Sequence, residues 1–197
     1  MPERRHTYKQ TMSAYTDDEL VRGARNLDQN VLVEIYDRYS SGIFAFAYRL
    51  LGNSEMAEDC VAETFTRFLN ALQNQKGPSE NIRAYLYRIA HNWINDIYRS
   101  QASIKEESIE DRLEIKDAIH VEESVDYKWQ IATIREHIMN LTPDQRMVIT
   151  LRYIEGWDLE DIAGALQKPV GAVKALQHRG LSVLQKTLGR QEDSNEI

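Results

Sequence analysis

Positive charge without compensating acid gathers near the C-terminal end of the sequence. No Asp or Glu occurs between positions 169 and 190, where the cationic residues are Lys174, Arg179, Lys186 and Arg190. The chain of 197 residues has a formal net charge of -7, so this local excess runs against its overall composition. Cations along one helix face can contact a phosphate backbone, which favours nucleic-acid binding over an ordinary solvated helix, the simpler alternative.

A helix-turn-helix is expected to position these cations. Its first helix is predicted from Leu159 to Leu166, with Asp158 as the candidate N-cap. Pro169 cannot continue that helix but fits the first turn of a second one, which is expected to start near Val170. On a helical wheel the second helix has an apolar stripe of Val173, Leu176, Gly180, Leu184 and Leu188. Its opposite arc carries Gly171, Lys174, Ala175, His178, Arg179, Ser182 and Lys186.

Another line of polar and aromatic residues recurs at helical spacing in the middle of the chain. Its members are Tyr85, Arg88, Asn92, Asp96 and Arg99. An aromatic ring, an amide and guanidinium groups on one face can stack on unpaired bases, donate to base edges and hold phosphates. The alternative is a solvated face in which Asp96 pairs with its neighbours along the helix.

The remaining candidate residues do not indicate a catalytic site. Glu58, Asp59 and Glu63 share one helix, but they lack the histidine partner of a helical di-metal motif, and no phosphate-binding or dinucleotide-binding motif occurs. Cys60 is the single cysteine, which excludes an internal disulfide and a multi-cysteine zinc site. We therefore predict no enzyme activity, metal or cofactor. The sequence has no long apolar run and no signal segment. We therefore expect a cytoplasmic location and no membrane insertion.

The elements that must carry these residues are all predicted to be helical, in two small domains. A mobile tail is expected over 1–15, a first helical domain over 16–101, an acidic and flexible linker over 102–128, a second domain over 129–190, and a tail over 191–197. The first domain is expected to hold four helices, the first of which begins at a capping box of Thr16 and Glu19. The other three span about 28–51, 54–73 with Ser54 as N-cap, and 82–103.

The second domain is expected to hold four helices as well. The first lies near 129–139, and the next begins at Thr142, with Pro143 at its first position and Gln145 closing a capping box. That helix is predicted to run to Gly156, and the helix-turn-helix follows it.

Four blocks of sequence together resemble the sigma-70 family of bacterial RNA polymerase sigma factors, in particular the extracytoplasmic-function (ECF) group. The likeness covers about residues 17–190. The blocks are 58–65 with Phe68 and Leu69, 84–92 with Asp96 and Arg99, 141–146, and 170–179. Their order and spacing are more specific than any single block.

The resemblance implies a transcription initiation factor that binds core RNA polymerase through its clamp helices and flap, and binds promoter DNA. It assigns polymerase binding to Asp59, Glu63, Phe65 and Arg67. Capture of the melted minus-10 element is assigned to Lys76, Asn81, Arg83, Tyr85, Arg88, Asn92 and Arg99. Readout of the minus-35 element as duplex is assigned to Gly171, Lys174, Ala175, Gln177, His178, Arg179 and Lys186. An anti-sigma factor is a candidate partner, because such a factor is usual in the family.

Several positions depart from the family pattern. Ala62 stands where Gln is usual, Tyr85 where Trp is usual, and Ala172 and Ala175 replace hydroxyl residues, so base preference cannot be copied across. A stand-alone helix-turn-helix transcriptional regulator remains the alternative function. It would need a self-interaction surface, and the sequence offers no coiled-coil seam for one.

Overall fold

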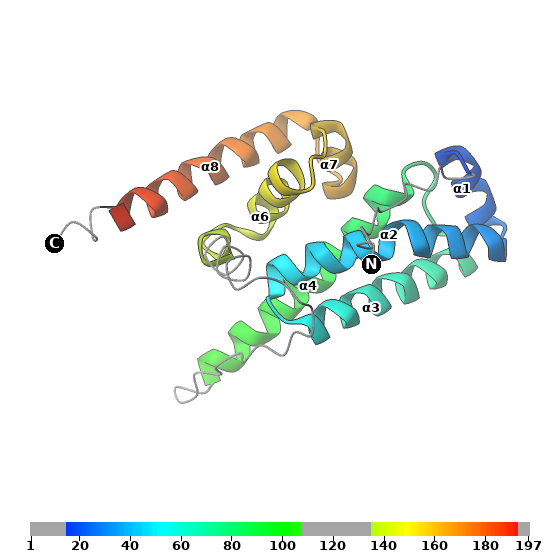
Figure 1. Ribbon diagram of the computed structural model, residues 1–197, viewed down its shortest axis with the longest axis horizontal. Helices are drawn as coiled ribbons and strands as arrows, with labels where there is room; N and C mark the ends of the chain where they lie inside the picture. The colour runs from blue at the N-terminus through cyan, green and yellow to red at the C-terminus, as the bar shows by residue number, and fades with distance from the viewer. Residues whose placement is uncertain (1–14, 108–134, 193–197) are drawn as a thin grey trace, which may run out of the picture.

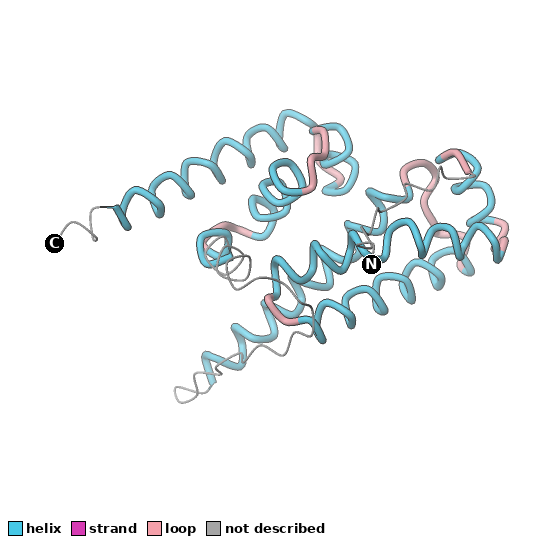
Figure 2. Tube along the Cα trace, viewed as in Figure 1, coloured by secondary structure: helices cyan, strands magenta, loops and turns pink. Residues whose placement is uncertain are grey.

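Every regular element in the described part of the chain is a helix. The computed structural model describes residues 15–107 and 135–192, and Figures 1 and 2 show their arrangement. The first unit contains α1 (Asp17–Arg25), α2 (Gln29–Leu51), α3 (Ser54–Gln73) and α4 (Ile82–Glu107). The second contains a helical stretch at 135–139, α6 (Pro143–Ile149), the π-helix η1 (Thr150–Ile154), α7 (Leu159–Leu166) and α8 (Val170–Glu192). The all-helical prediction is confirmed.

Side-chain caps fix where several helices begin. At α1 the Thr16 hydroxyl accepts from the Glu19 amide at 3.3 Å, and the Glu19 carboxylate accepts from the Thr16 amide at 2.8 Å, as the capping box predicts. Asp28 caps α2, because its carboxylate accepts from the Asn30 amide at 2.9 Å. Gly52 closes the C-terminal end of α2 in the left-handed conformation, with φ of 67°, which glycine adopts without a steric penalty.

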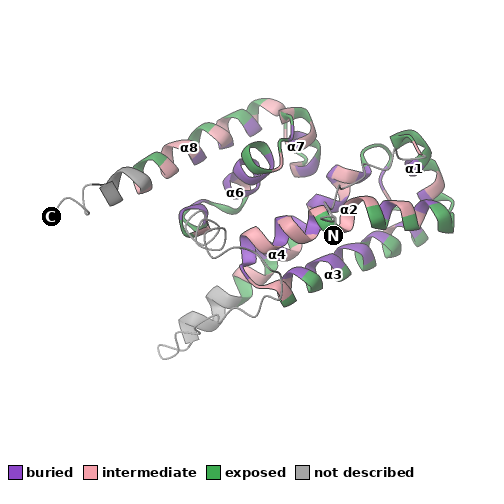
Figure 3. Ribbon diagram, in the orientation of Figure 1, coloured by how far each residue is buried: buried purple, intermediate pink, exposed green. Residues whose placement is uncertain are grey.

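The first unit is built on α2, α3 and α4, which pack on one another with α1 against α2. Figure 3 shows buried residues on the inner sides of these helices and exposed residues on their outer sides. The centre is apolar and closely filled: Ile35, Phe46, Phe68, Leu86 and Ile94 are each no more than 1% exposed. This core sets how α3 and α4 pack together and therefore which of their residues face outward.

The second unit packs α6 and α7 against α8, around Met147, Leu151, Ile162 and Val173. A carboxylate oxygen of Asp158 accepts from the Asp161 amide at 2.7 Å, so the predicted N-cap of α7 is confirmed. α8 starts at Val170, as predicted, and Figure 1 shows it leading away from the other helices. At Gly180 an added Cβ would lie 3.0 Å from Ile149 Cγ1, so glycine permits the close approach of α8 to α6.

The two units lie against each other, with α7 beside α4. A Cβ added at Gly164 would lie 3.8 Å from Ala84 Cβ, which shows how closely the two helices approach. Tyr87 and His91 of α4 are buried at this contact, with 3% and 6% of their surface exposed. On the side of α4 toward the first unit Ile82, Leu86 and Ala90 are buried, whereas Ile89, Trp93 and Ile97 are partly exposed.

Two local predictions were wrong, and a third is refined. Asn53, rather than Ser54, caps α3, because its side-chain oxygen accepts from the Met56 amide at 2.8 Å. α4 continues to Glu107, so the segment predicted as a linker begins inside a helix. The helix predicted to run from Thr142 to Gly156 is confirmed as a helical run to Ile154, with its last part, η1, in the π-helical form and Gly156 at φ of 71° after it. The rest of the predicted linker, the helix residues before 135 and most of both predicted tails lie outside the described residues.

Leu86→Ala should lower the free energy of unfolding by about 2–5 kcal/mol, because Leu86 is 0% exposed and its truncation leaves a cavity among α2, α3 and α4. Urea unfolding followed by circular dichroism measures this change. Val33→Ala is the matched control, since Val33 is 59% exposed on α2, and it should change stability by no more than about 0.5 kcal/mol. Equal effects of the two substitutions would contradict this packing.

Candidate nucleic-acid interface

The exposed side of α8 carries cations that no acid neutralises within the described residues. Lys174, Arg179 and Lys186 are exposed, and none of them forms an ion pair there; His178 is exposed beside them. An added Cβ at Gly171 would meet nothing within 4 Å, so the start of the helix faces open space. Most of the predicted minus-35 residues therefore lie on one open, positively charged face of α8. Ala175 is half-exposed, and Gln177 is the exception.

Gln177 is turned toward η1 rather than left free. Its side-chain nitrogen donates to the Tyr153 hydroxyl at 2.7 Å, and Tyr153 is 54% exposed. The π-helical turn brings Tyr153 to this position beside α8, and such turns are frequent at functional sites. Sequence reasoning missed Tyr153, because a helical wheel of uniform pitch cannot place a residue that lies in a π-turn.

The predicted minus-10 face begins at the loop before α4. Asn81 caps α4, with its side-chain oxygen accepting from the Ala84 amide at 2.8 Å. The Tyr85 hydroxyl donates to the Lys76 carbonyl oxygen at 3.3 Å, which ties the loop to the helix. Gly77 lies so close to Leu72 that an added Cβ would be 2.5 Å from Leu72 Cδ2. The loop between α3 and α4 is thus held by the hydrogen bonds at Lys76 and Asn81 and by the packing of Gly77 on Leu72.

Further along α4 the predicted aromatic and cationic residues do lie together. The Arg88 guanidinium lies 4.8 Å from the centre of the Tyr85 ring, and the ring packs against Phe68 at 6.1 Å. A base that stacks there would therefore meet Tyr85 and the planar guanidinium together. Asn92 is exposed beside them, and Arg99 pairs with Asp96 at 3.2 Å, as the solvated-face alternative expects.

Two other predicted minus-10 residues are already in contact with the second unit. The Asn81 amide donates to an Asp161 carboxylate oxygen at 2.9 Å. The Arg83 guanidinium lies 3.8 Å from the centre of the Trp157 ring. The face predicted from the sequence is therefore divided: Tyr85, Arg88 and Asn92 remain accessible, and Asn81 and Arg83 are engaged.

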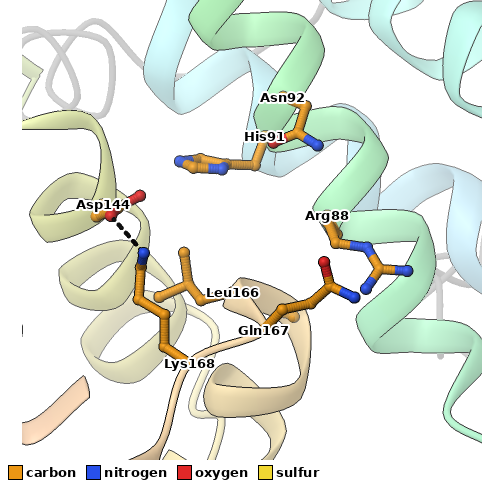
Figure 4. Close-up of a pocket in the computed structure, with 8 residues that line it drawn as sticks. Arg88, His91, Asn92, Asp144, Leu166, Gln167 and Lys168 are labelled. Carbon is orange, nitrogen blue, oxygen red and sulfur yellow. Dashed lines mark ion pairs between the residues drawn. The ribbon is translucent and has the colours of Figure 1, made fainter. Parts of the chain in front are cut away.

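A small polar cavity lies between part of α4 and the second unit, as Figure 4 shows. Arg88, His91 and Asn92 line it from α4, and Lys168, which pairs with Asp144 at 3.3 Å, lines it from the opposite side. Its volume is about 190 Å³. Within the described ranges, no group of three or more His, Cys, Asp or Glu side chains is arranged to hold a metal ion.

The predicted polymerase-binding residues lie on α3, but they differ in exposure. Asp59 is exposed, and Glu63 accepts from Arg67 at 2.7 Å on the same outer side. Phe65 is only 8% exposed and lies 4.8 Å from the ring of Tyr36, so it supports this surface from below rather than forming it. An open groove beside these residues is lined by Tyr36, Ser40, Ser41 and Phe44 of α2 and by Glu58, Val61 and Ala62 of α3.

Two family models match the chain, one over most of the first unit and one over most of the second. Residues 35–104 match the family model described as Sigma-70 region 2, and residues 131–184 match Sigma-70, region 4. The ECF RNA polymerase sigma factor SigW of Bacillus subtilis is 30% identical, with the match covering 85% of this chain and 94% of SigW. This chain belongs to the ECF group of sigma-70 family sigma factors. The family resemblance noted in the sequence is confirmed.

Other relatives agree with this membership. The ECF RNA polymerase sigma factor BldN of Streptomyces coelicolor is 28% identical over 86% of this chain, and the chain spans 65% of BldN. A solved structure of CnrH in complex with the cytosolic domain of CnrY is 24% identical and has a TM-score of 0.65, covering 88% of this chain and 97% of that one. The sigma factor RpoE of Bartonella quintana, solved with the anti-sigma factor NepR, has a TM-score of 0.59 at 24% identity, covering 84% and 98% of the two chains. Both structures share this fold.

His91 should make stability depend on pH. Burial lowers the pKa of His91, although the Pro143 carbonyl and Asp144 oppose this shift; Arg146 and Lys168 add to it. The folded structure therefore favours the neutral ring. The stability that neutral His91 contributes to folding is complete above the ordinary histidine pKa of about 6.5 and is lost as the pH falls below that value. Urea unfolding at pH 7.5 and 5.5 measures this loss.

The control for this titration is His91→Gln, which keeps an amide donor for the Pro143 carbonyl oxygen, now 3.3 Å from His91 Nε2. We expect a smaller loss of stability between the two pH values in this variant. An identical loss in the variant and the unmodified chain would show that other groups account for the pH dependence.

Proposed function

We propose that this chain is a transcription initiation factor that binds core RNA polymerase and directs it to promoters. In this proposal α8 reads the minus-35 element as duplex, and the face of α4 captures melted minus-10 bases. The unpaired cationic face of α8, in a chain with an overall charge of -7, is the observation that carries the DNA-binding part. The chain itself makes and breaks no covalent bond and acts in the cytoplasm, where polymerase and chromosome are found.

Capture of unpaired bases supplies a physical route to promoter opening. Stacking of a base on an aromatic side chain contributes about 1–3 kcal/mol. Only a strand whose bases are flipped out can make this contact, so stacking stabilises the open promoter. Tyr85 with Arg88 above its ring offers one such platform, and Asn92 beside it can donate to a base edge. The promoter is then held open by binding alone.

We propose the groove between α2 and α3 as the docking surface for the polymerase clamp helices. It combines apolar side chains with a rim of charge from Glu58 and Asp59. Apolar contact with a polar rim is the usual composition of a protein interface. An anti-sigma factor is a further proposed partner, since the relative from Bartonella quintana was solved with one.

Asp59→Arg should weaken binding to bacterial core RNA polymerase by at least about tenfold, because it reverses an exposed charge on the proposed docking surface. Titration of labelled chain with core polymerase measures the dissociation constant. Asp18→Arg, at an exposed position of α1, makes the same charge change elsewhere and should leave the constant unchanged. Unaltered affinity of the Asp59 variant would show that the polymerase binds another surface.

Lys174→Ala combined with Arg179→Ala should weaken promoter binding by the polymerase complex, because two exposed cations are lost from α8. The DNA is a promoter fragment selected from random duplexes by the unmodified chain with core polymerase. If both residues contact phosphates, the salt dependence of log K should become shallower by about 2. Arg22→Ala with Arg25→Ala removes the same charge from α1 and serves as the control. Equal promoter affinity in both double variants would remove α8 from the interface.

A further inference from the structure

The contact between Tyr153 and Gln177 follows from the packing of α8 on α6. Gly180 allows α8 to approach α6 closely, because an added Cβ there would lie 3.0 Å from Ile149 Cγ1. The π-helix η1 continues α6, so it runs beside the turn of α8 that precedes Gly180. Helix packing therefore brings the Tyr153 hydroxyl oxygen to within 2.7 Å of the Gln177 side-chain nitrogen.

Hydrogen bonds fix the shape of the turn that carries Tyr153. The Glu155 amide donates to the Thr150 carbonyl oxygen at 3.1 Å, which is the i to i+5 bond of a π-helix. The Arg152 guanidinium donates to the Trp157 carbonyl oxygen at 2.7 Å and closes the end of the turn. The ring of Tyr153 nevertheless remains 54% exposed. A turn of fixed shape thus presents this hydroxyl at the surface.

Gln177 lies at the margin of the cationic face of α8. It follows the exposed Lys174 by three residues, so the two side chains lie on neighbouring turns, and it directly precedes the exposed His178. Gln177 itself is partly exposed. In a helix-turn-helix the first turns of the second helix contact base edges. Gln177 is therefore placed to meet a base pair of a duplex that the cations hold by its phosphates.

The bond to Tyr153 changes what the Gln177 amide can offer to a base. A glutamine amide has two N–H donors and one carbonyl acceptor, and here one N–H donates to the hydroxyl oxygen. One donor and one acceptor remain. In the major groove adenine presents one donor and one acceptor, its N6 amino group and N7, whereas guanine presents two acceptors, O6 and N7. The remaining groups of Gln177 match adenine and do not match guanine.

We infer that Tyr153 is a positioning residue that makes Gln177 specific for adenine over guanine at one base pair of the bound duplex. Without the hydroxyl both N–H groups would be free, and the amide could turn to donate to guanine. The bond also restrains the side-chain rotamer before DNA binds, which lowers the entropy lost on binding. This readout rests on the proposed function of α8, while the pair itself stands on its contact.

Tyr153→Phe isolates the hydroxyl, because it keeps the ring and leaves Gln177 in place. The DNA is the promoter fragment selected by the unmodified chain with core polymerase, in which Gln177→Ala identifies the base pair that Gln177 reads. At that pair adenine is replaced by guanine, and the ratio of the two dissociation constants is measured for each polymerase complex. The ratio is independent of how much polymerase each variant binds.

We expect replacement of adenine by guanine to weaken binding of the unmodified complex by about tenfold. The ratio should fall to about threefold or less with Tyr153→Phe and to about twofold or less with Gln177→Ala. Adding Tyr153→Phe to Gln177→Ala should cause no further change, because the hydroxyl acts only through the amide. Gln29→Ala, at an exposed position of α2, removes a glutamine elsewhere and should leave the ratio at about tenfold.

Three results would overturn the inference. An unchanged ratio in the Tyr153 variant would show that the hydroxyl does not set the preference. Equal weakening on both fragments, present also in the Gln177→Ala background, would make Tyr153 a separate phosphate contact. No change in preference at any base pair with Gln177→Ala, or loss of a preference for a base other than adenine, would remove Gln177 as the adenine reader.

Nuclear magnetic resonance of the free chain tests the pair without DNA. The side-chain amide signals of Gln177, assigned by their loss in Gln177→Ala, should shift in Tyr153→Phe and exchange with water faster than in the unmodified chain. Unchanged signals would overturn the pair. If the signals shift but the unmodified chain with core polymerase selects no sequence from random duplexes, the pair stands and the proposed function is refuted.

Discussion

Burial of the Trp157 indole between Tyr87 and Arg83 is the contact on which the arrangement of the two units depends. The apolar cores of the two units join in one buried cluster, and α4 also meets the second unit where Ala84 approaches Gly164. Because α4 also carries the accessible Tyr85 and Arg88, the same helix serves both an internal interface and a candidate DNA surface.

The exposed faces of α8 and α3 differ in charge. The chain as a whole is acidic, with a net charge of -7, while the exposed arc of α8 is cationic and α3 presents carboxylates. The overall field of such a chain gives little affinity for DNA, so in the proposed function the phosphate contacts would come from a few cations on one helix. Polymerase would supply the additional affinity by holding both units near the promoter.

Local chemistry was predictable from the sequence, and contacts between distant segments were not. The caps at Thr16 and Asp158 follow from side chains within three residues of the amides they bind, and the cap of α3 lies one residue from the predicted position. Trp157 gave no comparable signal, because its partners lie more than sixty positions away. The candidate site shows the same division: periodicity found the cationic arc of α8, but neither the pairing of Tyr153 with Gln177 nor the engagement of Asn81 and Arg83.

The most direct measurement of the central claim is gel filtration of the purified chain mixed with bacterial core RNA polymerase, with each component also run alone. Membership of the ECF group and the groove between α2 and α3 predict that the chain elutes with the polymerase in a stable complex. A chain that elutes apart from the polymerase but binds duplex DNA as a dimer would contradict this account and identify a stand-alone regulator.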